Sequence, residues 1–547
     1  MNKNLVFWMT AWPAIALGAC ATLQPPRPPH PHLETAKACA DWRWIGISRP
    51  GVSCPDIPGW TVQPLFGKVS PALQKAEDIC AAKGSERGDL RTAKESEKVP
   101  GPEVIQELSR FCVYEAAHQG LAQPKSPPAR SAELVRLDQD CADLASPVPR
   151  DPGVESAASS SYDFLREAGL PAEPLTIANP YGVRLAFLDT QPTSGSLPEW
   201  QGNSPHGYAL AYIGKNLVCE GESCAARITT RLALPILEFN AKSPRRNRRD
   251  EHMGGYLGMQ SDLAEAIKTE VDAWRSERRR GGSERHLVLN LSLAWDGELF
   301  GGLDEEQIAE MQAGTQAIYR ALQYAAGFDA LVLAAAGNAK AEPCANFGPL
   351  LPGAWEAGSV REESCREQPL LYAVGGLGAS GFPLANARPG GMPRRAAYAE
   401  NAVVPCPLAS GYTTALTGSS VATAVASSIA ADVWASFPEL SASDVMNILD
   451  ESGYELSIPA DFWFGASASS ASVRPKVHKL SLCAALALAC ARARSTSCPV
   501  QLPCDRPWRT SSALPGHSGP SPKRESCQPW LSPQPESPPC PTCGPPY

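Results

Sequence analysis

Residues 286–294 read HLVLNLSLA, residues 305–326 read EEQIAEMQAGTQAIYRALQYAA, and residues 331–338 read LVLAAAGN. The first and last segments are short apolar runs, as expected for strands that are covered on both faces. The segment between them has helical character. A strand, a helix and a second strand in this order predict a βαβ unit on a parallel sheet.

The same alternation extends outward from this unit. We therefore predict an α/β fold over residues 176–491, with a doubly wound, largely parallel sheet and helices on both faces. In such sheets ligands bind at the carboxyl ends of the strands. The further segments are VRLAFLD (183–189), HGYALAYIG (206–214), LALPIL (232–237) and SDLAEAIKTEVDAWRSE (261–277).

The N-terminus has the features of an export signal. Residues 1–19 hold one Lys followed by an apolar stretch that is too short for a comfortable membrane span. The small residues before Cys20 resemble the lipobox of bacterial lipoproteins, which implies lipidation of Cys20 and anchoring on the periplasmic or extracellular face of a bacterial cell envelope. The alternative is an ordinary signal peptide with an incidental cysteine. Pro-rich residues 20–35 predict an extended spacer.

Two segments flank the α/β region. Residues 36–150 contain five cysteines and helix-like pieces such as PEVIQELSRFCVYEAAHQGLA (102–122), and they predict a small N-terminal module, either a pro-segment or a spacer domain. Residues 492–547 form a Cys- and Pro-rich tail that is disulfide-knotted, unfolded or the product of a frame error. The 18 cysteines of the 547-residue chain indicate an oxidising compartment.

Four polar residues lie where chemistry is expected. Asp189 ends an apolar strand, Asn338 ends another, and His206 opens an apolar helix. Ser420 lies in GSSVA (418–422), at the first turn of a helix of small residues, where the helix dipole and a free N–H suit a nucleophile that generates an oxyanion. Each of these signals is weak alone, because Asp189 and Asn338 are then read as turn residues and Ser420 as a helix cap.

Their order along the chain resembles the subtilisin-like serine proteases. Strand-Asp, His-Gly-helix, an N-L-S-L strand, strand-AAGN and G-S-S-V-A follow one another as in that family. LLYAVGGLG (370–378) resembles the strand before the serine loop. ELSASDVMNILDESG (439–453) resembles the next helix with Ser441 as its N-cap, and VHKLSLCAALALA (477–489) resembles the closing strand and helix.

The resemblance implies a serine endopeptidase that acts on polypeptide substrates. Ser420 would attack the scissile carbonyl, His206 would accept its proton, and Asp189 would orient the imidazole. The Asn338 side chain and the Ser420 N–H would form the oxyanion hole. The substrate backbone would pair with Leu291, Ser292, Leu293 and Ala294.

The composition and motifs give no support for other ligands. A formal net charge of −8 gives no indication of the basic surface that binds nucleic acid. No acidic loop or CxxC pair matches a metal site, so we expect no cofactor; calcium is implied only by the family resemblance.

The chain departs from the family pattern at Gln191, Ala294 and Ala424, where the family has Gly, Gly and Pro. Ala294 would narrow the substrate cleft. Together with long inserts, these departures motivate the alternative of an envelope-anchored binding or scaffold protein on a non-catalytic subtilisin-like fold. Cys219 with Cys224, and Cys344 with Cys365, could staple the inserts.

Overall fold

The computed structural model describes residues 38–67, 100, 102–116, 128, 131–142, 164–165, 168–169, 179–189, 206–220, 223–232, 259–295, 297, 302, 310–338, 350–356, 369–405, 413–459, 462 and 476–493.

The fold is α/β and is built on an eight-stranded sheet in the order β15-β16-β12-β11-β10-β9-β5-β8. All neighbours in this sheet are parallel except β15 and β16. The predicted strands at 183–189, 286–294, 331–338 and 370–378 are all present. The strands are β5 (Val183–Asp189), β8 (Ala226–Leu232), β9 (His286–Leu291), β10 (Leu331–Ala335), β11 (Tyr372–Leu377), β12 (Arg395–Tyr398), β15 (Tyr454–Ser457) and β16 (Lys476–Lys479).

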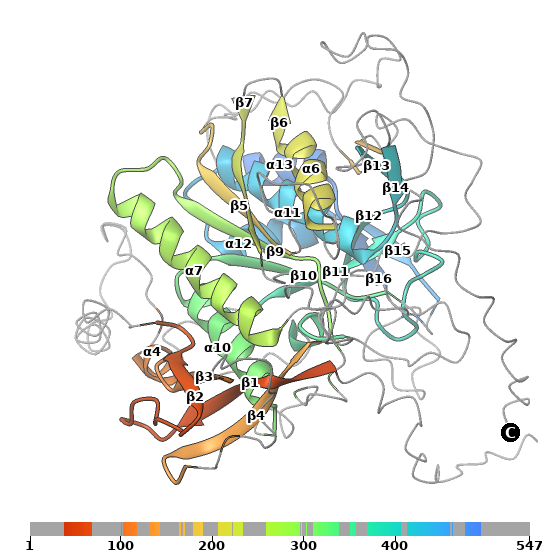
Figure 1. Cartoon of the computed structure of the whole chain (residues 1–547). Helices are drawn as coiled ribbons and strands as arrows, with labels where there is room; N and C mark the ends of the chain where they lie inside the picture. Colours follow the sequence, from red (N-terminus) through yellow and green to blue (C-terminus); the bar gives the residue numbers. More distant parts are fainter. Residues whose placement is uncertain are drawn as a thin grey trace, which may run out of the picture. The chain divides into compact units, whose positions relative to one another are not determined.

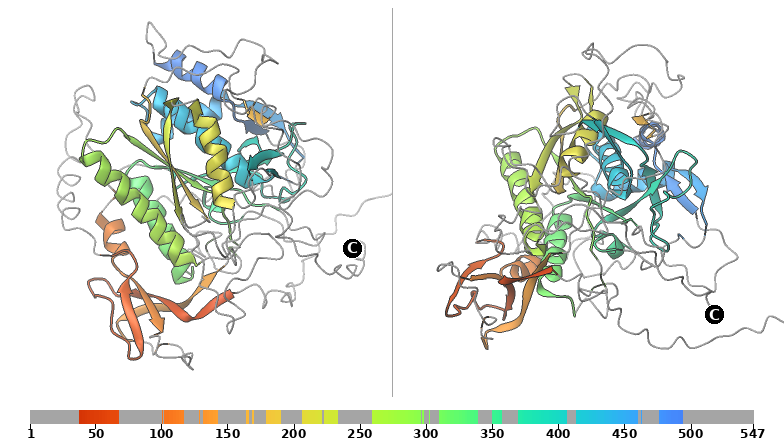
Figure 2. Two further views of the ribbon diagram at one scale, coloured as in Figure 1. Left: turned by 45° about the horizontal axis from the view of Figure 1, so that its top comes forward. Right: turned by 45° about the vertical axis from the view of Figure 1, so that its right-hand side comes forward.

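Helices cover both faces of the sheet, as the sequence predicts (Figures 1 and 2). On one face lie α7 (Gln260–Arg279) and α10 (Ala313–Gly327), which pack on each other. The other face carries α6 (His206–Val218), α11 (Ser419–Ser436), α12 (Ala442–Ser452) and α13 (Leu482–Arg492).

The strand sequences divide their apolar side chains between these two faces. In β5, Val183, Leu185 and Phe187 join the hydrophobic cluster under α6 and α11, whereas Ala186 and Leu188 join the cluster under α7 and α10. Successive side chains of a strand point to opposite faces, so a continuous apolar run is required where both faces are buried.

Residues 38–142 form a four-stranded antiparallel sheet in the order β2-β3-β1-β4, with the helix α4 (Pro102–Leu108) beside it. This sheet packs on α10 and α7, and its Ile45, Ile47 and Phe111 belong to the same hydrophobic cluster as those helices (Figure 1). The strands are β1 (Ala38–Ser48), β2 (Trp60–Pro64), β3 (Phe111–Ala116) and β4 (Leu134–Ala142).

The structure corrects the helical interpretation of PEVIQELSRFCVYEAAHQGLA. Within the described part of this segment, residues 102–116, the helix covers 102–108, while residues 111–116 (FCVYEA) form β3 in the interior of the small sheet. Aromatic and β-branched residues favour strands, and pairing with β1 and β2 on either side outweighs the helical spacing of the apolar residues. The helix expected at 305–326 begins only at Ala313 among the described residues.

Several smaller expectations are confirmed. Ser441 caps α12 in a capping box with Asp444, whose backbone N–H donates to the Ser441 hydroxyl at 3.1 Å. Cys219 and Cys224 form a disulfide between β6 (Cys219–Glu220) and β7 (Ser223–Cys224).

A second disulfide, Cys54–Cys112, joins the loop after β1 to β3 and was not predicted. Cys20, Gln191, Cys344, Cys365 and residues 494–547 of the tail lie outside the described residues. No helix in the described part of the chain is long and apolar enough to cross a membrane.

Candidate active site

Asp189 is the last residue of β5 and is almost completely buried, with 1% of its surface exposed. The strand is paired on both sides, with β8 and with β9, so the position of its carboxyl end is fixed by two ladders of hydrogen bonds. The apolar run before Asp189 ends where the carboxylate begins. This places a charge at the carboxyl edge of the sheet, where ligands bind in such folds.

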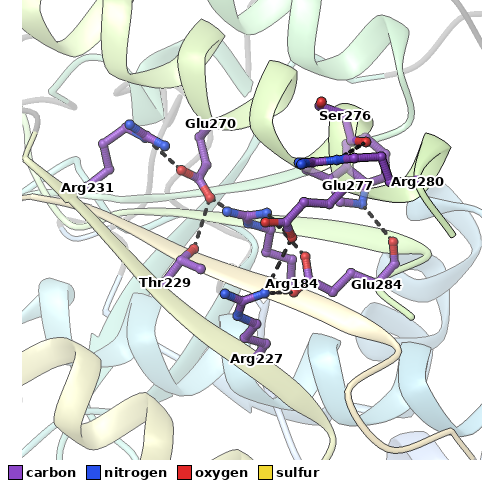
Figure 3. A network of polar contacts seen from close by, with 10 residues as sticks. Arg184, Arg227, Thr229, Arg231, Glu270, Ser276, Glu277, Arg280 and Glu284 are labelled. Atoms are coloured by element: carbon purple, nitrogen blue, oxygen red, sulfur yellow. Dashed lines mark hydrogen bonds and ion pairs between the residues drawn. The ribbon is translucent and has the colours of Figure 1, made fainter. Parts of the chain in front are cut away.

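An ion-pair network holds β5 and the edge strand β8 against α7 (Figure 3). Arg184, five residues before Asp189, donates to Glu270 at 2.7 Å and to Glu277 at 3.0 Å, both on α7. Arg231 of β8 donates to the second oxygen of Glu270 at 2.6 Å. Arg184 and Glu270 are buried, and a charge there is tolerated because each one has opposite charges within hydrogen-bond distance.

Glu284 extends this network at the turn that leads into β9. It accepts hydrogen bonds from Arg184 at 3.2 Å and from Arg227 at 3.0 Å. Burial raises the pKa of the Glu284 carboxyl, and the two guanidinium groups oppose that rise. The network thus runs along the strand that carries Asp189, from Arg184 near its amino end to Arg231 of β8, which pairs with Leu188 directly before Asp189.

His206 opens α6 and faces Asp189. Its Nδ1 lies 3.0 Å from both carboxylate oxygens of Asp189, and the imidazole is buried. An ionised carboxylate can only accept, so Nδ1 carries the proton and Nε2 is left as the proton acceptor of the neutral ring. α6 approaches β5 closely because residue 214 is glycine: a Cβ there would lie 2.4 Å from the Phe187 ring.

Ser420 is the second residue of α11, a helix whose 18 residues are all buried. Its hydroxyl donates to the backbone carbonyl of Ser292 at 3.2 Å, and the Ser292 hydroxyl shares its proton between Asn290 Oδ1 at 2.8 Å and the backbone carbonyl of Ser420 at 3.0 Å. This reciprocal pair attaches the start of α11 to the end of β9. Within the described residues the Ser420 backbone N–H has no hydrogen-bond partner, as is usual in the first turn of a helix.

Asn338 joins the start of α11 to the end of β10. Its Oδ1 accepts the Ser419 backbone N–H at 2.9 Å, so its amide nitrogen occupies the other branch of the side chain. A Cβ on Gly418 would lie 2.9 Å from that nitrogen, so a larger residue at 418 would have to displace the Asn338 amide. Gly337, with φ of +90°, provides the turn that directs Asn338 towards α11.

The four candidate residues thus lie at the carboxyl edge of the sheet, at the ends of β5 and β10 and the starts of α6 and α11. The structure brings Asp189 and His206 into contact and places Asn338 against Ser419, the first residue of α11 and the neighbour of Ser420. The sequence alone did not identify Gly418 as part of this arrangement, although its place directly before the two serines was visible.

The predicted substrate segment is less regular than expected. Leu291 ends β9, while Ser292, Leu293 and Ala294 follow the strand and are buried. Directly after them, Trp295 pairs with Leu351 in an antiparallel bridge. The pairing of this segment with a substrate stays a prediction.

No metal site is apparent in the ranges that the structure covers. They contain no group of three or more His, Cys, Asp or Glu side chains arranged to hold an ion.

No family model matches the chain, and no curated protein matches it. Several solved structures are similar to it. They include the prenylagaramide maturation protease PagA (18% identity, 60% of this chain and 98% of that chain, TM-score 0.35). MycP1 from Mycobacterium smegmatis has 17% identity over 68% of this chain and 92% of its own, with a TM-score of 0.36. The MycP3 protease of the type VII (ESX-3) secretion system has 21% identity over 63% of this chain and 92% of its own, with a TM-score of 0.33. At these scores the activity of the present chain must be decided by its own site.

Proposed function

We propose that this chain is a serine endopeptidase of the subtilisin-like kind, with Asp189, His206 and Ser420 as its catalytic triad. The observation that carries the proposal is the buried His206 whose Nδ1 is held by both oxygens of Asp189 at 3.0 Å, on the edge of the sheet where α11 presents Ser420. A nucleophile, a base and a group that orients the base are the parts required for acyl transfer.

In the proposed reaction the Ser420 hydroxyl attacks the scissile carbonyl while His206 Nε2 accepts its proton. The C–N bond breaks when His206 returns this proton to the leaving amine, and water then hydrolyses the acyl-enzyme by the same route in reverse. Because the resting hydroxyl donates to the Ser292 carbonyl, it must first turn from that carbonyl towards His206. Catalytic hydrogen bonds often form only with substrate bound.

Asn338 is the proposed side-chain donor of the oxyanion hole. Its oxygen is occupied by the Ser419 N–H, which fixes the orientation of the amide and leaves the nitrogen as the end that can donate. The Ser420 N–H at the start of α11 would be the second donor, supported by the positive end of the helix dipole. Both donors are fixed by contacts between elements before any substrate binds.

The experiment that tests this function is labelling of the purified full chain by a fluorophosphonate, followed by identification of the modified residue. We expect the label on Ser420 and its loss in Ser420→Ala. Ser419→Ala is the matched control, because the Ser419 hydroxyl is buried without a partner among the described residues, and its backbone N–H survives the substitution. A chain that takes no label and hydrolyses no protein would refute the triad and favour the non-catalytic alternative.

We further propose that the chain is exported and held on the bacterial envelope by a lipid on Cys20. The lipobox-like residues before Cys20 support this proposal, as does the disulfide bonding of Cys54, Cys112, Cys219 and Cys224, which requires an oxidising compartment. Intact mass measurement should show a diacylglyceryl-modified Cys20 at the mature N-terminus. In Cys20→Ser the protein should leave the membrane fraction, and a wild-type protein without acyl mass would refute the anchor.

A further inference from the structure

The carboxyl ends of β9 and β10 separate directly beside Ser420. The last registered pair between these strands joins Leu291 to Ala334. Beyond it, Ser292 exchanges hydrogen bonds with Ser420, while Asn338 accepts the Ser419 N–H, so the first turn of α11 bridges the two strand ends. If Ser420 is acylated and the oxyanion faces Asn338, the acyl group lies beside the ends of these two strands.

Residues 350–355 contact the chain at both strand ends. The Trp295 N–H donates to Leu351 O at 2.7 Å and the Leu351 N–H donates to Trp295 O at 2.9 Å, which attaches the segment to the β9 side. On the β10 side, a Cβ on Gly353 would lie 2.9 Å from the Ala335 carbonyl oxygen. The segment is therefore wedged between the two strand ends.

Leu350 lies against the residue that precedes Asn338. A Cβ on Gly337 would meet Leu350 Cδ1 at 2.7 Å, and Leu350 is only 2% exposed. Ala294 and Trp295, which follow the end of β9, are both 1% exposed, and the Trp295 ring packs edge-on against Trp355 with centroids 5.6 Å apart. Buried apolar side chains thus pack tightly against the ends of both strands.

From this packing we propose that the enzyme cleaves after small residues, namely Gly, Ala or Ser, and that Leu350 sets this limit. The inference rests on the proposed peptidase function. The limit follows from close packing, because a well-packed wall admits extra methylene groups only by displacing side chains or backbone. Leu350 is a specificity residue in this scheme and takes no part in the chemistry.

The test is hydrolysis by the full chain of fluorogenic peptides that differ only in the residue whose carbonyl is attacked. We expect kcat/KM to fall by about 100-fold or more from Ala to Phe or Leu, since even one methylene group in an apolar pocket changes this ratio by roughly 10- to 200-fold. Equal or faster cleavage after Phe, Leu or Lys would overturn the inference. If that occurs while fluorophosphonate still labels Ser420, the peptidase function stands; if neither labelling nor hydrolysis occurs, both fail.

Leu350→Ala should raise kcat/KM for the Leu peptide relative to the Ala peptide at least about tenfold. Leu371→Ala is the matched control, because Leu371 is a buried Leu at the amino end of β11, on the opposite edge of the sheet, and its loss should leave the ratio unchanged. Should Leu350→Ala fail to fold, Leu350→Val should shift the same ratio in the same direction. An unchanged ratio in a folded Leu350 variant overturns the assignment of Leu350.

Discussion

The contact between the N-terminal sheet and α7 contains a buried excess of negative charge, and it predicts a stability that falls as pH rises. Arg43 of β1 lies 3.2 Å from Asp140 of β4 and 3.0 Å from Asp262 of α7. Glu115 of β3 is 3.6 Å from the same guanidinium, and Glu265 of α7 adds a further negative charge near Asp262. One cation therefore faces three carboxylates, with a fourth nearby.

Burial raises the pKa of Asp262 to about 7 from its ordinary value of 3.8, Arg43 lowers it, and Asp140 raises it further. Because the folded-state pKa is the higher one, the protonated carboxyl stabilises the fold. This contribution is complete below about pH 4 and is lost as pH rises through 7. At about 1.4 kcal/mol for each pH unit between the two values, the loss is up to roughly 4 kcal/mol.

The perturbation is Asp262→Asn, which keeps the shape of the protonated carboxyl and removes its charge. We expect wild type and variant to have similar free energies of unfolding below about pH 4, and the variant to become the more stable as pH rises, by a few kcal/mol at pH 8.5. Urea unfolding of the full chain, followed by intrinsic tryptophan fluorescence across this range, measures the difference. Glu265→Gln, at an exposed position of the same helix, should leave the pH dependence nearly unchanged.

A variant that is less stable than wild type at pH 8.5 would refute the reasoning. It would show that the attraction of Asp262 to Arg43 exceeds the cost of burying the carboxylate. A constant difference at all pH values would equally count against it, because only a titrating Asp262 produces a change with pH.

Two further predictions concern the site and its support. Asn338→Asp keeps the acceptor for the Ser419 N–H but loses the amide donors, so kcat should fall at least about 100-fold with little change in Tm. Asn338→Ala loses both and should also lower Tm. Near-wild-type turnover by Asn338→Asp would exclude the oxyanion role. The His286 ring stacks on Trp434, and its Nε2 donates to Pro438 O at 2.8 Å. Burial lowers the pKa of His286 to about 4. The neutral His286 ring stabilises the fold fully above about pH 6.5, and this contribution is lost as pH falls through 4. Between pH 7 and 4 the free energy of unfolding of wild type should therefore fall by roughly 3 kcal/mol more than that of His286→Gln. Equal pH dependences of the two proteins in urea unfolding would contradict this.

Much of the fold was readable from the sequence because its signals are local. The strands at 183–189 and 331–338 are continuous apolar runs. The start of α12 is indicated by Ser441 and Asp444, which lie three residues apart. These features depend on nearest neighbours and on burial of both faces of a central sheet. The order of Asp189, His206 and Ser420 along alternating elements was equally visible, since parallel strands bring their carboxyl ends to one edge.

What escaped the sequence depends on contacts between distant segments. Residues 111–116 carry apolar residues at helical spacing, and only pairing with β1 and β2 makes them a strand. The packing of the N-terminal sheet on α10 joins residues that are more than 200 positions apart, such as Ile45 and Tyr319. No local pattern distinguishes such a docked sheet from an independent module.

The site itself shows the same division between local and distant causes. Ser420 is recognisable from the small residues around it, but two contacts with other elements set its position. Ser420 is hydrogen-bonded to Ser292, which follows β9, and the neighbouring Ser419 N–H donates to Asn338, which follows β10. Gly418 permits the second of these contacts, because a Cβ there would lie 2.9 Å from the Asn338 amide nitrogen. The geometry of the nucleophile is therefore a property of three strand and helix ends together, and a substitution at Gly418 should disable the site while leaving Asp189 and His206 in place.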